Sequence, residues 1–233
     1  MNKKKIFAID IDGTLTENGN GIVHLPALHL FRILEKLGHH VIYVTGRSSI
    51  EAYVLAVFGG TTKIAVGENG GVITTGPTDH ILLANKDECI NGFNFLKEHI
   101  HNIKIKNVFN RMTEVVLERN FDIKKGQEIF DKNNIDLYLN DSKYAYHINK
   151  IGVNKGKGIT KISEMLNIPL KEIIAIGDSE TDIPMFDICG YSIALNHADN
   201  NVKRRAKHVV SGNSGIGLVE ALEFSTKNIL SEL

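Results

Sequence analysis

Two aspartates that stand one residue apart form the first pattern in the chain that could do chemistry. Asp10 and Asp12 follow a short apolar run at residues 6–9, and Gly13 comes directly after them. Two like charges about 4 Å apart cost roughly 4 kcal/mol at an effective dielectric of about 20, so the pair is unfavourable unless a cation or a proton is shared. A divalent metal ion would remove this conflict. The pair therefore indicates a metal site, although an acidic turn that only caps the next segment would contain the same residues.

A second acidic turn follows another apolar run, at residues 173–176. Asp178 and Asp182 lie in the segment Gly-Asp-Ser-Glu-Thr-Asp, and their spacing allows a turn or a short helix start to face both carboxylates inward. The carboxyl ends of parallel strands meet at one edge of an open α/β sheet, where ligands bind. If both apolar runs are strands of one sheet, the two acidic turns lie close together at that edge.

A hydroxyl and a glycine stand at the end of a third apolar run, at residues 41–44. Thr45 and Gly46 lie between this run and a helical pattern at residues 50–58. Backbone amides at a helix start and the helix dipole both favour an anion, so this pair suits a phosphate oxygen. A simple helix cap explains the same residues equally well. Asn69, in the glycine-rich turn after residues 63–66, either lines the same site or only forms its turn.

The elements that must position these residues alternate along the chain. A strand, helix, strand order predicts right-handed parallel βαβ units, and hence an α/β fold with a Rossmann-like parallel sheet. The polar residues 16–22 predict a loop or a small flap over the site. Strand patterns occur at 6–9, 41–44, 63–66, 173–176, 191–195 and 208–210, with a hairpin partner at 72–75, and helical patterns begin at Pro26, Ile50 and Gly152 and near Ile216.

The pattern changes between residues 76 and 152. Helical stretches at 86–101 and 122–133 alternate with strand patterns at 113–117, 135–139 and 144–148, which predicts a small α+β unit. The chain of 233 residues is long for one compact domain and short for two. We therefore expect a core domain at residues 1–77 and 153–233, interrupted by an inserted α+β cap domain at residues 78–152.

Composition and charge argue against several classes of function. Apolar residues make up 42% of the chain, and 27 basic residues balance 27 acidic ones, so no net field favours nucleic acid or an anionic membrane. The basic start of the chain precedes too short an apolar run for an export signal, and no apolar stretch approaches the roughly 18 residues of a membrane span. Cys89 and Cys189 are far apart in the sequence. We expect a reducing, cytoplasmic location.

Four signatures in this order resemble the haloacid dehalogenase superfamily of phosphotransferases. They are Asp10-x-Asp12-Gly13-Thr14, Thr45-Gly46, Lys155 and Gly177-Asp178-x-x-x-Asp182. The inserted segment lies between the second and third signatures, as in the type 2 cap of that superfamily. Residues 8–16 and 67–73 are most similar to the archaeal phosphoglycolate phosphatases of the sucrose-phosphate-phosphatase-like branch. The resemblance covers most of the core and is diffuse in the cap.

The resemblance implies a role for each acid. Asp10 would be the nucleophile that takes the phosphoryl group as an aspartyl-phosphate. Asp12 would protonate the leaving alcohol and then deprotonate the attacking water, and its backbone carbonyl would bind magnesium. Asp178 and Asp182 would complete the Mg²⁺ site, directly or through water. Because the Asp12 carboxylate has no cation of its own in this scheme, we expect it to hold a proton more easily than Asp10 does.

The resemblance also implies ligands for the phosphoryl group. Thr45, the Gly46 amide and Lys155 would hold its oxygens. The uncatalysed hydrolysis of a phosphate monoester is very slow, so an enzyme must accelerate it with positioned charge. Thr181 stands where relatives commonly carry asparagine, a departure that concerns the surroundings of the metal site.

A magnesium-dependent phosphatase for a small phosphorylated metabolite follows from the resemblance, with 2-phosphoglycolate as the first choice of substrate. The main alternative is a sugar-phosphate or broad-specificity phosphatase, followed by a phosphomutase or a binding protein without turnover. Nucleic acid and membrane are not expected partners, and a homodimer would agree with the cap-mediated dimers of relatives. His147, Arg119 and Lys150 are candidate cap contacts, although surface or packing roles explain each of them as well.

Overall fold

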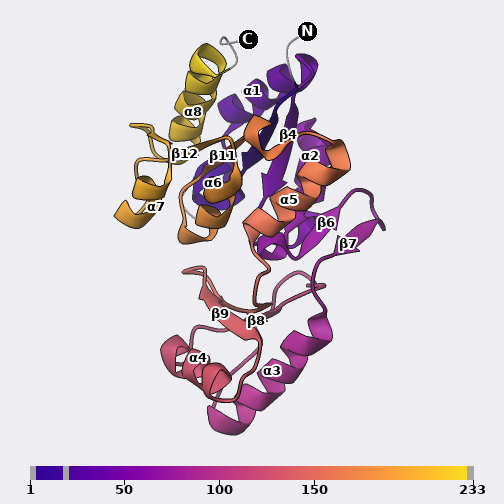
Figure 1. Cartoon of the computed structure of the whole chain (residues 1–233), viewed down its shortest axis with the longest axis vertical. Coiled ribbons are helices and arrows are strands. Elements are labelled where there is room, and N and C mark those ends of the chain that lie inside the picture. The colour runs from indigo at the N-terminus through magenta and orange to yellow at the C-terminus, as the bar shows by residue number, and fades with distance from the viewer. Residues whose placement is uncertain (1–3, 18–20, 230–233) are drawn as a thin grey trace.

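The described part of the chain, residues 4–17 and 21–229 of the computed structural model, contains a sheet of eight strands. This sheet lies in the larger of two units, the upper one in Figure 1. Neighbouring strands are parallel except at one edge, where β5, β6 and β7 are antiparallel. In sheet order the strands are β13 (His208–Val209), β12 (Tyr191–Ala194), β11 (Ile173–Gly177), β1 (Ile6–Ile9), β4 (His40–Val44), β5 (Ala65–Gly67), β6 (Val72–Thr74) and β7 (His80–Leu82).

The register of the central strands brings the polar turns to one edge. Ile9 on β1 pairs with Tyr43 on β4 and with Ile176 on β11, all in parallel. The turns that follow these three strands therefore leave the sheet side by side. They carry Asp10, Thr45 and Asp178, as the sequence predicted for the carboxyl edge of the sheet.

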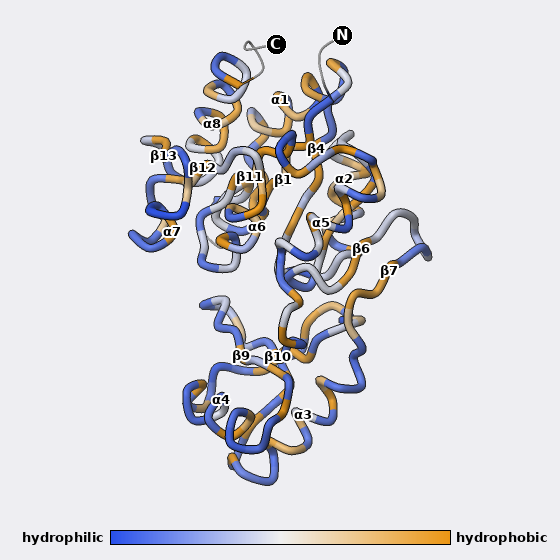
Figure 2. Tube along the Cα trace, viewed as in Figure 1, coloured by the Kyte–Doolittle hydropathy of each residue, from blue (hydrophilic) through white to orange (hydrophobic). Residues whose placement is uncertain are grey.

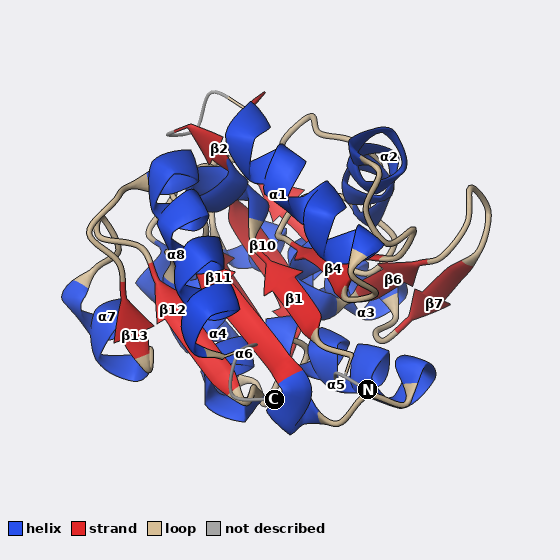
Figure 3. Cartoon of the chain, turned by 90° about the horizontal axis from the view of Figure 1, so that it is seen from above, coloured by secondary structure: helices blue, strands red, loops and turns tan. Residues whose placement is uncertain are grey.

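Helices cover both faces of this sheet, as Figure 3 shows from above. Phe7 and Ile9 pack on one face against α1 (Leu25–Lys36), α2 (Ser49–Gly59) and α8 (Ser214–Asn228). Ile6 and Ala8 pack on the other face against α5 (Lys155–Leu166), α6 (Ile183–Ile188) and α7 (Asn200–Arg205). Because alternate residues of β1 are buried on opposite faces, the strand is apolar throughout, and the hydrophobic colour of Figure 2 gathers on β1, β4 and β11.

The smaller unit is an antiparallel α+β arrangement. Its described residues form a sheet in the order β8 (Val115–Leu117), β10 (Tyr146–Lys150), β9 (Leu137–Asp141). Two helices, α3 (Lys86–His99) and α4 (Ile123–Lys132), pack on this sheet through a core of their own that includes Phe93 and Phe130. The predicted α/β fold with an inserted α+β unit is confirmed.

The strand β7 lies after residue 77, where the sequence predicted the boundary of the insert. β7 pairs with β6 as the last strand of the large sheet, so the proposed division after residue 77 falls inside a hairpin. Gly76 and Pro77 suggested a boundary in the sequence, but they lie in the turn of this hairpin, which Thr75 and Asp79 close with a backbone hydrogen bond. We propose residues 4–83 and 153–229 as the core and residues 84–152 as the insert.

Residues 16–22 were expected to form a loop or flap. The structure pairs β2 (Thr16–Glu17) with β3 (Ile22–Val23) in antiparallel orientation, and residues 18–20 lie outside the described part of the chain. None of the helices in the described ranges combines the length and the apolar character that a membrane span needs.

The turn after β5 packs tightly on the start of α5. Gly70 has a φ of +98°, and a Cβ atom at this residue would lie 1.9 Å from the backbone oxygen of Asn154. Asn154 precedes Lys155, so this close approach sets where α5 begins relative to the sheet. Only glycine fits here, because both the backbone conformation and the lack of space exclude a side chain.

We expect Gly70→Ala to lower the free energy of unfolding by about 3 kcal/mol or more, because it adds a backbone clash to an unfavourable φ. Gly152→Ala is the matched control, since Gly152 has a φ of +81° and no atom within 4 Å of its added Cβ. The control should lose only about 1 to 2 kcal/mol. Urea unfolding followed by circular dichroism measures both, and equal losses would show that the approach to Asn154 can relax.

Candidate active site

The first acidic turn is shaped by a close contact with the second. After β1 the chain makes a wide turn, η1 (Ile11–Leu15), in which Gly13 has a φ of +83°. A Cβ atom on Gly13 would lie 2.6 Å from Oδ2 of Asp178, so glycine allows this carboxylate to approach the turn. Thr14 donates a hydrogen bond to Oδ1 of Asp178 at 2.8 Å. The two acidic turns therefore form one site.

A buried lysine lies between two of the carboxylates. Nζ of Lys155 is 2.6 Å from Oδ1 of Asp10 and 2.5 Å from Oδ1 of Asp182, and all three side chains are at most 5% exposed. Lys155 is the first residue of α5, whose start is fixed by Asn154 as N-cap, accepting from the Lys157 N–H. Although burial opposes the charged form, Asp10 and Asp182 raise the pKa of the Lys155 ammonium above its usual range. The ammonium therefore stays charged.

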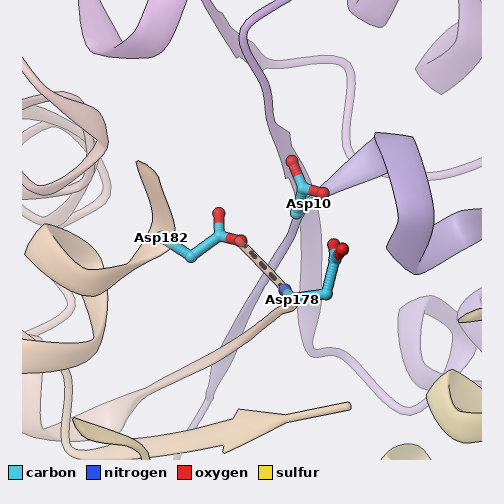
Figure 4. A group of neighbouring side chains, drawn as sticks. All are labelled: Asp10, Asp178 and Asp182. Atoms are coloured by element: carbon cyan, nitrogen blue, oxygen red, sulfur yellow. Dashed lines mark hydrogen bonds between the residues drawn. The ribbon is translucent and has the colours of Figure 1, made fainter. Parts of the chain in front are cut away.

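Asp182 organises the turn that carries Asp178. Its Oδ2 accepts hydrogen bonds from the backbone N–H groups of Asp178 and Ser179, at 3.0 and 2.9 Å, and from the Ser179 hydroxyl. Figure 4 shows the bond to the Asp178 backbone and the three aspartates around one space. The other oxygen of Asp182 accepts from Lys155. Both oxygens of Asp182 are thus engaged.

The aspartates fit a divalent cation. Oxygen atoms of Asp10, Asp178 and Asp182 lie within 4.8 Å of one another. Three carboxylates beside one ammonium leave a formal charge of −2, and hard oxygen ligands are those that magnesium prefers. Burial raises the pKa of the Asp10 carboxyl well above its usual range despite the opposing charge of Lys155, and Asp182 and Asp178 raise it further. A dication at this position would remove this excess of negative charge.

Thr45 and Gly46 lie at the expected edge. Thr45 is fully buried, and its hydroxyl accepts from the Arg47 N–H at 3.1 Å. Its carbonyl accepts from the Asn69 N–H at 3.0 Å, so the turns after β4 and β5 are joined. A Cβ atom on Gly46 would lie 3.1 Å from Oδ1 of Asn69. Asn69 therefore borders Gly46, the first of the two alternatives for this residue.

The side chain of Asp12 does not join the acidic cluster. Arg47 binds it with a two-pronged contact, Nε to Oδ2 at 2.8 Å and Nη2 to Oδ1 at 2.7 Å. The expectation that the Asp12 carboxylate has no cation of its own is wrong. Arg47 follows Gly46 directly, and Glu51 on α2 holds its other nitrogen at 3.2 Å. The turn after β4, which contains Thr45, Gly46 and Arg47, lies beside the turn after β1, so the position of Arg47 in the sequence already placed it near Asp12.

Two further residues of the site lacked a clear sequence signal. Nε2 of His197 lies 3.1 Å from Oδ2 of Asp178, and the loop after β12 brings it there. Thr14 formed part of the first signature, but nothing in the sequence indicated that its hydroxyl binds Asp178. Both contacts join segments that are far apart in the chain, so spacing alone could not predict them.

The three candidate cap residues pair within the insert. Arg119 binds Asp141 at 2.9 Å and Lys150 binds Glu88 at 2.5 Å. His147 is buried with its Nδ1 3.1 Å from Glu114. A residue that the sequence did not single out, Arg111, instead reaches the core, where its Nη1 donates to the Gly46 carbonyl at 2.8 Å.

Replacing Lys155 by methionine tests whether this ammonium holds the carboxylates together. Removing one partner of a buried pair costs about 3 to 5 kcal/mol. The loss should be larger near pH 8 than near pH 5, because a carboxyl whose pKa is raised in the folded state destabilises the fold as the pH rises. Urea unfolding in EDTA measures this. Lys157→Met, at an exposed position of the same helix, should show little loss at either pH, and a pH-independent loss for Lys155→Met would contradict the charge argument.

Comparisons with known proteins show which family the chain belongs to. A family profile described as haloacid dehalogenase-like hydrolase matches residues 7–107 and 85–222. A protein named phosphoglycolate phosphatase from Nitrosopumilus maritimus is 53% identical over 99% of this chain and 100% of its own length. One of the same name from Methanosarcina acetivorans is 35% identical over 97% of this chain and 98% of its own.

A solved structure from Thermoplasma acidophilum has the same fold. Its TM-score is 0.81 at 23% identity, and the superposition covers 94% of this chain and 97% of that one. The profile spans both parts of the core as well as the insert between them. The chain belongs to the haloacid dehalogenase-like hydrolases.

Proposed function

We propose that this chain is a magnesium-dependent phosphatase that hydrolyses 2-phosphoglycolate to glycolate and phosphate through an aspartyl-phosphate intermediate. The observation that carries the proposal is the buried group of Asp10, Lys155 and Asp182, with Asp178 beside it, at the carboxyl edge of the sheet. The choice of substrate rests on relatives at 53% and 35% identity that are named phosphoglycolate phosphatase and match nearly the full chain.

The first half of the reaction forms a bond between Asp10 and phosphorus. A carboxylate oxygen of Asp10 attacks, the bond from phosphorus to the ester oxygen breaks, and Asp12 donates a proton to the departing alkoxide. Lys155, the Thr45 hydroxyl and the Gly46 amide hold the phosphoryl oxygens, whose negative charge would otherwise repel the nucleophile. In the second half Asp12 takes a proton from water, which attacks phosphorus and releases Asp10 and phosphate.

Asp10 and Asp178 are the proposed side-chain ligands of magnesium, with Asp182 acting directly or through water and Asp12 through its backbone carbonyl. A bound magnesium ion supplies positive charge between the nucleophile and the phosphate. Both oxygens of Asp182 already accept hydrogen bonds, which favours its contribution through water. This assignment uses the formal charge of −2 that Asp10, Asp178, Asp182 and Lys155 carry together.

The contact between Arg47 and Asp12 adds a step to this scheme. Arg47 engages both carboxylate oxygens of Asp12, so Asp12 must turn away from Arg47 before one of these oxygens can face the leaving group. The two side chains are 43% and 36% exposed, which leaves Asp12 free to turn.

A cytoplasmic location is part of the proposal. Cys89 and Cys189 are both buried and unpaired, as suits a reducing compartment. The substrate is then a free metabolite of the cytoplasm, with no nucleic acid or membrane involved.

Asp10→Asn should lower phosphate release from 2-phosphoglycolate by roughly 10⁴-fold or more, because it removes the covalent route. The measurement is a phosphate assay with magnesium on a panel that includes phosphoglycolate, sugar phosphates and simple alkyl phosphates. Asp87→Asn, which changes an exposed carboxylate of the insert, should leave the rates unchanged. A preference for sugar phosphates would keep the mechanism and overturn the substrate, whereas activity that survives Asp10→Asn would overturn the mechanism.

Asp12→Asn should affect substrates according to their leaving groups. An alkoxide such as glycolate needs a proton in order to leave, so kcat on phosphoglycolate should fall by about 10²- to 10⁴-fold. The first step on p-nitrophenyl phosphate should fall much less, because nitrophenolate leaves without a proton. Pre-steady-state release of nitrophenolate separates this step from the hydrolysis that follows. If the rate of the first step fell by the same factor on both substrates, the role of Asp12 as an acid would be ruled out.

A further inference from the structure

One arginine of the insert is buried against the turn after β4 in the core. We call this turn, which contains Thr45 and Gly46, the phosphate turn. The side chain of Arg111 is 9% exposed, and its Nη1 is 2.8 Å from the Gly46 carbonyl oxygen and 3.2 Å from Oε1 of Glu114. Gly46 is also the residue whose amide is proposed to hold the phosphoryl group. A guanidinium group therefore lies immediately beside the position proposed for the phosphate.

One edge of this guanidinium is unused. In the described part of the chain, both polar contacts of the Arg111 side chain are made by Nη1. Nε is buried and has no hydrogen-bond partner among residues 4–17 and 21–229. The edge formed by Nε and Nη2 can bind the two oxygens of a carboxylate at once, a geometry for which arginine is suited. A buried donor without a partner lowers the stability of the fold, and a ligand that accepts its hydrogen bond would recover this free energy on binding.

A second unused donor borders the same glycine. Asn69 is 3% exposed, and its Nδ2 has no partner among the described residues. This nitrogen would lie 3.4 Å from a Cβ atom on Gly46. Two buried side chains that each carry an unpartnered nitrogen, Asn69 from the core and Arg111 from the insert, therefore both border Gly46. Both are donors, and together they suit an anion.

The turn that carries Asn69 is strained and holds the insert in place. Glu68 and Asn69 have φ values of 53° and 52°, which side chains seldom adopt. The Glu68 carboxylate accepts from the backbone N–H groups of Met112 and Thr113, at distances of 2.8 to 3.0 Å. Such strain persists where a site needs a defined geometry. Glu68 thus fixes Arg111 and Asn69 relative to each other.

A buried chain of contacts orients Arg111 from the other side. Glu114 is fully buried and binds His147 at 3.1 Å and Asn149 at 2.9 Å. Although burial opposes it, His147 and Arg111 hold the pKa of the Glu114 carboxyl below its usual range. The carboxylate stays ionised and pairs with Nη1, so the other edge of the guanidinium remains available. Glu114 is a positioning residue in this arrangement.

We propose that Arg111 and Asn69 form the subsite that binds the carboxylate of the substrate. The inference rests on the proposed function and names the residues that select a phosphorylated acid. The carboxylate of phosphoglycolate is separated from the ester oxygen by a single carbon, so a carboxylate subsite must lie beside the phosphate turn, as Arg111 and Asn69 do. The unpartnered nitrogens, Nε of Arg111 and Nδ2 of Asn69, are donors that suit the lone pairs of a carboxylate, and the guanidinium adds a positive charge that a neutral sugar would not complement. They therefore favour an acid over a sugar.

The test compares two substrates that differ in one group. Ethyl phosphate has a methyl group where phosphoglycolate has its carboxylate, so the ratio of their kcat/KM values isolates recognition of that group. We expect Arg111→Gln to lower this ratio by roughly 10- to 100-fold, mainly through KM for phosphoglycolate. Arg111→Lys keeps the charge but cannot bind both carboxylate oxygens through two nitrogens, and it should lower the ratio less than Arg111→Gln does. Asn69→Gly tolerates the positive φ and should also lower it.

Arg119→Gln is the matched control, since it removes an arginine of the same insert that binds Asp141, and its ratio should equal that of the wild type. A loss of activity on both substrates by the same factor in all three site variants would show that these residues only hold the insert, and would overturn the subsite. A preserved preference for phosphoglycolate would overturn it too. Wild-type enzyme without a preference for phosphoglycolate would instead overturn the proposed substrate, and the subsite with it.

Discussion

The site depends on the attraction between one buried ammonium group and the carboxylates around it. Lys155 binds Asp10 across 145 residues of sequence and Asp182 across 27. These bonds tie the start of α5 to β1 and to the turn after β11. Without the cation, carboxylates that are almost fully buried would repel one another, and each would have to take up a proton or return to water. The electrostatic balance that holds the edge of the sheet together is thus the one that phosphoryl transfer requires.

Close backbone contacts make this balance possible. Gly13 lets Asp178 approach the first acidic turn, and Gly70 lets the turn after β5 touch the residue before Lys155. Both glycines have positive φ values, and both contacts join segments on either side of the insert. The insert can therefore vary in sequence without disturbing the charged groups, provided that the chain returns to the core at Asn154.

The core was predictable from sequence because its strands are short, apolar and followed by polar turns. β1, β4 and β11 could be placed within a residue, and parallel strands necessarily bring Asp10, Thr45 and Asp178 to one edge. Orientation of side chains was harder to predict, as the contact between Asp12 and Arg47 shows. Arg111 has no motif around it, and its place beside Gly46 follows from the docking of the insert, which no local pattern encodes. β7 was missed because Gly76 and Pro77 suggested a domain boundary, whereas they lie in the turn of a hairpin.

The two edges of the large sheet are formed by short strands, β13 with two residues and β7 with three. An edge strand exposes backbone donors and acceptors that can pair with a strand of another molecule. Strands of this length offer too few such groups to template a new ladder, while the long strands β4 and β11 lie inside the sheet. The same arrangement that places the reactive turns at the centre thus protects the folded protein against aggregation through its edges.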